Sequence, residues 1–235
     1  MWVFLPMMLL SLWPVAASTA RSDAKPGCQE KCGNVSVPYP FGILEPSCAM
    51  NDYFFLNCNS TDESHPELLF APNMPISNIS ELEGTVTVGI DAAFSCYNKT
   101  GIQTDFFQQQ MTLGSARPFM FSHTRNIFTA IAYDTLAVVT NYESTYGAAS
   151  DKSSLKISDW PLSRTAKYGK DAYATDVVIE WVVENKTCEK AKANTSAYSC
   201  GTNAYCTDPD EIDQGYRCLC NKGFEGNPYL KDGCQ

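Results

Sequence analysis

The chain has 235 residues, of which 44% are hydrophobic and 18% are charged, so it can bury a core and lacks the composition of a disordered chain. Its formal net charge of −9 argues against nucleic-acid binding, because phosphates are neutralised by clustered Lys and Arg. The two histidines, His65 and His123, lie far from any close pair of cysteines, so no zinc site is expected.

The first 20 residues are almost entirely apolar and have no charged side chain. Because the run is short and ends in small residues, it is typical of a secretory signal peptide, with an uncleaved membrane anchor as the alternative. No later apolar run approaches the roughly 18 residues that a membrane span needs. The sequence therefore predicts a secreted mature chain that begins at Arg21, in an oxidising compartment where cysteines pair.

The part of the chain before Cys188 is expected to be mainly β, with long loops. Short runs rich in β-branched or aromatic residues, bounded by Gly and Pro, predict strands at 53–56, 84–90, 134–140 and 176–183. Residues 84–90 also alternate between apolar and polar with a period of two. The segment 147–175 is polar and is interpreted as a poorly ordered connection.

The cysteines fall into two groups, five between residues 28 and 96 and six from residue 188 onward. This distribution predicts two domains with a boundary near residue 187. The expected organisation is a signal peptide at 1–20, a first domain at 21–147, a variable connection with the last strand of that domain at 148–187, and a small module at 188–235. The fold class is mainly β, with a disulfide-rich β domain followed by the small module.

Glycosylation is predicted by six N-x-[ST] acceptor motifs. One such motif is weak evidence, but six in a chain with a predicted signal peptide indicate a glycoprotein. The acceptors are Asn34, Asn59, Asn78, Asn98, Asn185 and Asn194.

The last six cysteines have the spacing C-x11-C-x5-C-x11-C-x1-C-x13-C, with Gly223-Phe224 after the close pair. This pattern resembles an EGF-like module. Six cysteines allow 15 connectivities, and the resemblance selects one of them. It implies the pairs Cys188–Cys206, Cys200–Cys218 and Cys220–Cys234.

An acidic cluster between two of these cysteines is interpreted as a solvated loop. It contains Asp208, Asp210, Glu211 and Asp213. Calcium-binding modules of this type carry carboxylates just before the first cysteine, whereas this chain has Lys186 there. No metal ion and no other cofactor is expected.

The N-terminal string CQEKCGNVSVPYPFGI, residues 28–43, resembles the start of the galacturonan-binding domain of plant wall-associated receptor kinases. Phe55-x-x-Cys58, Cys96-Tyr97-Asn98 and the tail Gly226-Asn227-Pro228-Tyr229 also match. The chain departs from that family at Ala132 and Tyr133, where a Gly-Cys pair is usual, and it has no cysteine within 147–175. We therefore expect a receptor-type ectodomain that lacks the transmembrane and kinase parts.

The resemblance implies non-enzymatic binding of pectin in the plant cell wall or apoplast. A galacturonan is a polyanion, so its contacts are expected to be cations and aromatic rings. The prolines at 38 and 40 favour an extended stretch that would present Tyr39 and Phe41 to sugars, although both rings also fit a core. The candidate ligand contacts are Lys31, Tyr39, Phe41, Lys99, Arg117 and Arg125.

The alternative function is a secreted decoy, or a protein-interaction ectodomain that acts on related receptors. Membrane association is expected only if this chain is a piece of a longer receptor. The sequence contains no nucleophile elbow, no zinc-protease motif and no phosphate-binding loop, so an enzyme is not expected.

Five cysteines cannot all pair within the first domain, so one is expected to be free or linked to another molecule. Cys96 is favoured as the unpaired residue, because it lies nearest in sequence to Tyr133, where the resemblance implies a sixth cysteine.

Overall fold

The structure is a computed structural model, and it describes residues 22–61, 64–72, 74–91, 94–107, 113, 118–122, 124–126, 135–140, 145–150, 174–194, 198–209 and 215–235. The predicted signal peptide lies outside these residues. So does most of the 147–175 segment, whose two ends belong to strands. Within the described ranges, no helix is long and apolar enough to cross a membrane.

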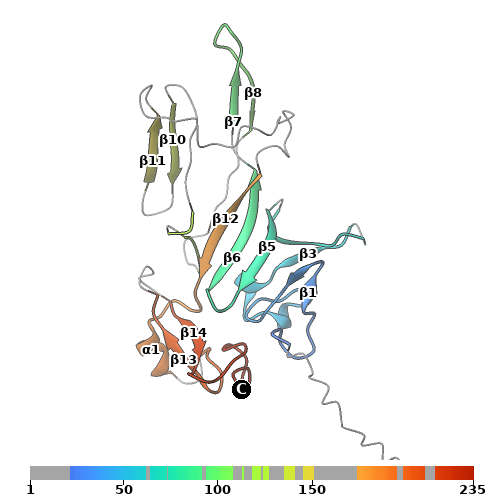
Figure 1. Ribbon diagram of the computed structural model, residues 1–235, viewed down its shortest axis with the longest axis vertical. Coiled ribbons are helices and arrows are strands. Elements are labelled where there is room, and N and C mark those ends of the chain that lie inside the picture. The colour runs from blue at the N-terminus through green and yellow to red at the C-terminus, as the bar shows by residue number, and fades with distance from the viewer. Residues whose placement is uncertain are drawn as a thin grey trace, which may run out of the picture.

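A six-stranded sheet with the order β3-β4-β5-β6-β12-β9 forms the centre of the fold (Figure 1). All of its neighbouring strands are antiparallel. The strands are β3 (Asn57–Asn59), β4 (Glu67–Ala71), β5 (Met74–Ser80), β6 (Thr85–Asp91), β9 (Phe119–Phe121) and β12 (Ala174–Trp181). Val177 of β12 pairs with Val88 of β6, so strands distant in sequence form the middle of the sheet.

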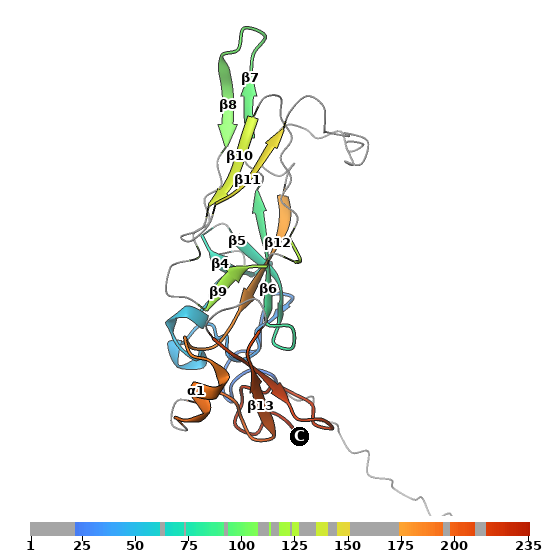
Figure 2. The ribbon, with the colours of Figure 1, turned by 90° about the vertical axis from the view of Figure 1, so that its left-hand side faces the viewer.

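Four antiparallel pairs surround this sheet. They are β1 (Lys31–Cys32) with β2 (Val35–Ser36), β7 (Phe94–Tyr97) with β8 (Gln103–Phe107), β10 (Thr135–Thr140) with β11 (Thr145–Ser150), and β13 (Ala204–Thr207) with β14 (Arg217–Cys220). Three short helices, η1 (Pro46–Cys48), η2 (Asp52–Phe54) and α1 (Cys188–Lys192), complete the described elements. The β7–β8 and β10–β11 pairs lie at the opposite end of the molecule from α1, β13 and β14 (Figures 1 and 2).

Three of the four predicted strands are confirmed. The runs 84–90, 134–140 and 176–183 correspond to β6, β10 and β12. The prediction of a strand at 53–56 is wrong, because a 3-10 helix occupies Asp52–Phe54. The Asn51 side chain accepts a hydrogen bond from the Tyr53 N–H at 3.0 Å, and this local bond stabilises a turn in place of an extended strand.

Five disulfides cross-link the chain. Cys28–Cys48 and Cys32–Cys58 fasten the first domain. Cys188–Cys206, Cys200–Cys218 and Cys220–Cys234 fasten residues 188–235, hereafter the C-terminal segment. The last three are the pairs that the EGF-like resemblance implies. Cys96, in β7, is the described cysteine without a disulfide.

One hydrophobic core extends across residue 187. Trp181 is fully buried, and its ring centroid lies 5.3 Å from that of Phe41 in the first domain and 5.3 Å from that of Tyr229 in the C-terminal segment. Phe54 packs against Trp181 at 5.7 Å. An isolated bridge between Val183 and Tyr216 also joins the two parts. The C-terminal segment is therefore packed on the first domain and shares its core.

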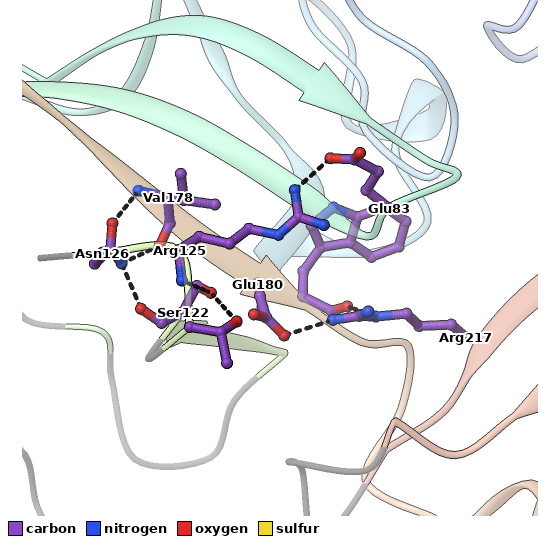
Figure 3. Close-up of polar contacts among 9 residues, drawn as sticks. Glu83, Ser122, Arg125, Asn126, Val178, Glu180 and Arg217 are labelled. Atoms are coloured by element: carbon purple, nitrogen blue, oxygen red, sulfur yellow. Dashed lines mark hydrogen bonds and ion pairs between the residues drawn. The ribbon is translucent and has the colours of Figure 1, made fainter.

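A partly buried ion pair reinforces this junction (Figure 3). Arg217 of β14 donates to the Glu180 carboxylate of β12 at 2.9 Å and to the Trp181 carbonyl at 3.1 Å. Burial raises the pKa of the Glu180 carboxyl, but hydrogen bonds from Ser122 and Arg217 and the nearby guanidinium charges lower it more. The pKa of Glu180 therefore lies below its usual value.

We expect Glu180→Gln to lower the free energy of unfolding by about 1–3 kcal/mol near pH 6, because it removes a charge-assisted hydrogen bond. Because the pKa of the Glu180 carboxyl is lower in the folded state, the ionised side chain stabilises the fold fully above about pH 4.3, the usual pKa of Glu in an unfolded chain. This stabilisation is lost as the pH falls through the lower folded-state pKa. Urea unfolding of both proteins between neutral and acidic pH tests this. The difference between them should shrink on acidification.

Glu83→Gln is the matched control for this prediction. Glu83 forms an ion pair with Arg125 at 2.6 Å, but the two side chains are 50% and 46% exposed. Exposed pairs contribute little, so this variant should change stability by less than about 1 kcal/mol at any pH. A Glu180→Gln effect that is equally large at every pH would contradict the role assigned to the carboxylate.

Candidate ligand-binding groove

An open groove of about 1060 Å³ lies between the first domain and the C-terminal segment. One wall is formed by residues 22 and 24–26 with Tyr39 and Met50, and the other by residues 198–202, 229–233 and 235. Figures 1 and 2 show the first and last described residues close together, at the end of the molecule that contains β13 and β14.

Asn227 fixes the two walls to each other. Its side-chain amide donates to the carbonyl oxygens of Asp23 at 2.8 Å and Tyr39 at 2.6 Å, and its Oδ1 accepts from the Tyr229 N–H at 3.0 Å. Asn227 is fully buried. Because these bonds form away from water, they hold the N-terminal residues in one position relative to the C-terminal segment.

Close backbone contacts fasten the wall of the C-terminal segment. The Gly201 N–H donates to the Pro228 carbonyl at 2.8 Å, and the Thr202 N–H donates to the Lys231 carbonyl at 2.7 Å. A Cβ on Gly201 would lie 1.8 Å from the Leu230 carbonyl oxygen, so only glycine allows this approach. Lys231 is thereby held at the groove with its side chain exposed.

Lys25 and Tyr39 are two polar residues of the first-domain wall. The Lys25 Nζ donates to the Ser47 carbonyl at 2.6 Å and lies 5.9 Å from the centroid of the Tyr39 ring, within the range of a cation–π contact. Tyr39 is half-buried, and burial raises the pKa of its phenol. A phenol is already uncharged at neutral pH, and this shift favours the uncharged form further, so Tyr39 does not repel an anion.

The charge of the groove is opposite to that of the chain as a whole. Lys25, Lys231 and Asp232 are its charged lining residues. Within the part of the chain that the structure describes, neither lysine takes part in an ion pair. Together with the rings of Tyr39 and Tyr198, these cations provide the chemistry to bind an anionic ligand that has apolar faces.

The predicted ligand-contacting cations are not brought together. Lys31 is exposed on β1, and Lys99 is exposed in the turn between β7 and β8. Figure 1 shows these two hairpins far apart. Arg125 is engaged by Glu83 (Figure 3), and Arg117 lies outside the described residues.

The two aromatic predictions have different outcomes. The chain turns at residues 38–41, where the Phe41 N–H donates to the Pro38 carbonyl at 2.9 Å, so the expectation of an extended stretch is wrong here. The turn directs Phe41 into the core, where it is 1% exposed and contacts Phe54 and Trp181. Phe41 therefore has no face available to a sugar, and its proposed role in binding is corrected to packing. Tyr39 lines the groove.

The glycosylation motifs lie on the surface and away from the groove. Asn59 is partly exposed, and the five others, Asn34, Asn78, Asn98, Asn185 and Asn194, are exposed. None of the six lines the groove. Glycans on these residues, which remain a prediction, would leave its walls accessible.

Among the described residues, no group of three or more His, Cys, Asp or Glu side chains is arranged to hold a metal ion. The Asp208 carboxylate accepts a hydrogen bond from the Cys188 N–H at 2.6 Å, at the start of α1. One of its oxygens is therefore already engaged by the backbone. The other members of the predicted acidic loop, Asp210, Glu211 and Asp213, lie outside the described residues.

Sequence reasoning missed Lys25, Tyr198 and Lys231. Each is unremarkable in its local sequence, and the two lysines lie near opposite ends of the chain. In the sequence, the Gly226-Asn227-Pro228-Tyr229 tail is informative only through its resemblance to the family. Its physical role, the attachment of one wall to the other, depends on contacts distant in sequence.

The sequence of this chain is similar to those of plant wall-associated receptor kinases. Residues 28–89 match the family model for wall-associated receptor kinase galacturonan-binding. Wall-associated receptor kinase 2 of Arabidopsis thaliana is 29% identical over 92% of this chain and 35% of its own length. Wall-associated receptor kinase 1 of the same plant is 24% identical over 99% of this chain and 37% of its own length.

A shorter match, to Arabidopsis thaliana wall-associated receptor kinase 5, is 44% identical over 25% of this chain and 8% of that protein. The chain thus spans little more than a third of the length of the first two relatives. No solved structure matches it. Residues 28–89 are thus similar to the domain that this family model describes, and the chain is homologous, over most of its length, to wall-associated receptor kinases.

Proposed function

We propose that this protein is a receptor-type ectodomain that binds galacturonan, the acidic backbone of pectin, in the plant cell wall and catalyses no reaction. The observation that carries the proposal is the match of residues 28–89 to a family model named for that ligand. In this proposal the C-terminal segment is an EGF-like module packed against the galacturonan-binding domain. Its three disulfides support that assignment.

An extracellular location is supported by the cysteine chemistry. Ten of the 11 cysteines take part in the five disulfides, as expected in an oxidising compartment. The six surface glycosylation motifs and the apolar N-terminal run support the same location.

Binding to a defined oligogalacturonide should weaken as salt increases. Contacts between cations and a polyanion are screened, with a Debye length of about 10 Å at 0.1 M ionic strength. Calorimetry of the secreted protein across a salt series measures this. The fully methyl-esterified oligomer, which lacks carboxylates, is the control and should bind weakly at every salt concentration. Equal binding of the two oligomers would contradict recognition of the acid.

A protein-interaction or decoy role is the second candidate, and the β7–β8 hairpin favours it. Tyr97 and Ile102 are each 63% exposed, and Phe106 is 59% exposed, although all three are large and apolar. Large apolar side chains that are exposed in this way are available to contact another protein. Binding that ignores pectin fragments, together with co-purification of a related receptor ectodomain, would favour this role.

A further inference from the structure

We propose that the groove between the first domain and the C-terminal segment is the site for the acidic sugar chain, with Lys25 and Lys231 binding its carboxylates from opposite walls. The inference rests on the proposed function and names the residues that carry it. It also makes the C-terminal segment part of the binding site, although the match to the galacturonan-binding family model ends at residue 89.

The first argument is the local reversal of charge. The whole chain has 17 basic and 26 acidic residues, yet the groove is lined by two lysines and one aspartate. Lys25 uses one of its three donors on the Ser47 carbonyl, so two remain for a ligand. An ammonium group on each wall suits a linear ligand that carries a carboxylate on each unit.

The second argument is the character of the surface between the cations. Tyr39 and Tyr198 are half-buried, so each ring is held by the protein while part of it stays accessible. Tyr198 is fixed by stacking on Tyr216, with centroids 6.0 Å apart and planes 14° from parallel. Ser199 and Thr202 also line the groove, so a ligand there would meet apolar ring faces and hydroxyls in addition to the two lysines.

The third argument is preorganisation. Asn227 joins the carbonyls of Asp23, two residues before Lys25, and of Tyr39 to the C-terminal segment. Lys231 is fixed at its backbone by Thr202, and the Cys28–Cys48 disulfide holds the Ser47 region close to Lys25. A site already fixed in this way loses little conformational entropy on binding, so even a few contacts can give measurable affinity.

The test compares two double variants of equal charge change. Lys25→Ala/Lys231→Ala removes both groove cations, and Lys31→Ala/Lys99→Ala removes two exposed lysines on separate hairpins. We expect the groove variant to bind an oligogalacturonide about tenfold more weakly than the wild type and the hairpin variant to bind within about twofold. Equal losses in the two variants, or a loss confined to the hairpin variant, would overturn the assignment.

A wild-type protein that binds no oligogalacturonide would refute the proposed function itself, which separates that failure from failure of the groove. Tyr39→Phe and Tyr39→Leu provide a second measurement, because the backbone carbonyl that Asn227 uses is retained in both. The ring-preserving variant should bind like the wild type and the leucine variant several-fold more weakly. Equal binding by both would show that the Tyr39 ring does not contact the ligand. Unchanged thermal unfolding confirms that each variant is folded.

Discussion

Trp181→Ala should lower the free energy of unfolding by about 3–5 kcal/mol, the range typical for truncating a buried Trp or Phe in a core. Trp181 is fully buried, and its ring contacts Phe41 and Phe54 of the first domain and Tyr229 of the C-terminal segment. The cavity would therefore remove packing from both parts at once. Domains are stable by only about 5–15 kcal/mol, so chemical denaturation should show a large shift of the midpoint.

Two further variants make this prediction decisive. Phe106→Ala truncates an aromatic ring that is 59% exposed and should change stability by no more than about 0.5 kcal/mol. Trp181→Phe keeps an aromatic ring and removes the indole Nε1, which has no hydrogen-bond partner among the described residues, so it should cost clearly less than alanine. If Phe106→Ala and Trp181→Ala had equal effects, the shared core would not be the main source of stability.

The strands were predictable where the local pattern and the tertiary environment agree. Residues 84–90 alternate, and β6 buries Val86 and Val88 on one face of the sheet. The run at 53–56 lacks such a distinguishing feature. A few consecutive apolar residues fit a strand or a buried turn equally well, and here the hydrogen bond that the Tyr53 N–H donates to the Asn51 side chain favours the turn.

The binding site was less accessible to sequence reasoning, because an isolated lysine or aromatic residue does not reveal its neighbours. Tyr39 and Phe41 are two residues apart in one motif, yet one lines a groove and the other is buried. Arg125 looked like a free cation until the structure placed it against Glu83. The pairing of Lys25 with Lys231 across the groove depends on how the C-terminal segment docks, and no local pattern encodes that docking.

The docking itself depends on Asn227, and Asn227→Ala should lower the free energy of unfolding by about 2–4 kcal/mol. Alanine leaves the Tyr39 carbonyl and the Tyr229 N–H without the partners that Asn227 provides, and each unsatisfied buried group costs about 1–3 kcal/mol. Urea unfolding measures the loss. Asn221→Ala is the matched control, because Asn221 is exposed in the same segment, and it should change stability by no more than about 0.5 kcal/mol.

Asn227→Asp separates the donors of the side chain from its acceptor. The carboxylate can still accept from the Tyr229 N–H, but it faces the carbonyls of Asp23 and Tyr39 with no proton to donate. Burial against these oxygens should raise the folded-state pKa of the new carboxyl above the unfolded-state value of about 3.9. The loss of stability relative to the wild type should then be complete at neutral pH and should shrink as the pH falls through the raised value, because the protonated acid regains one donor. A loss that is the same at every pH, or a variant as stable as the wild type at neutral pH, would show that the two carbonyl contacts do not hold the C-terminal segment in place.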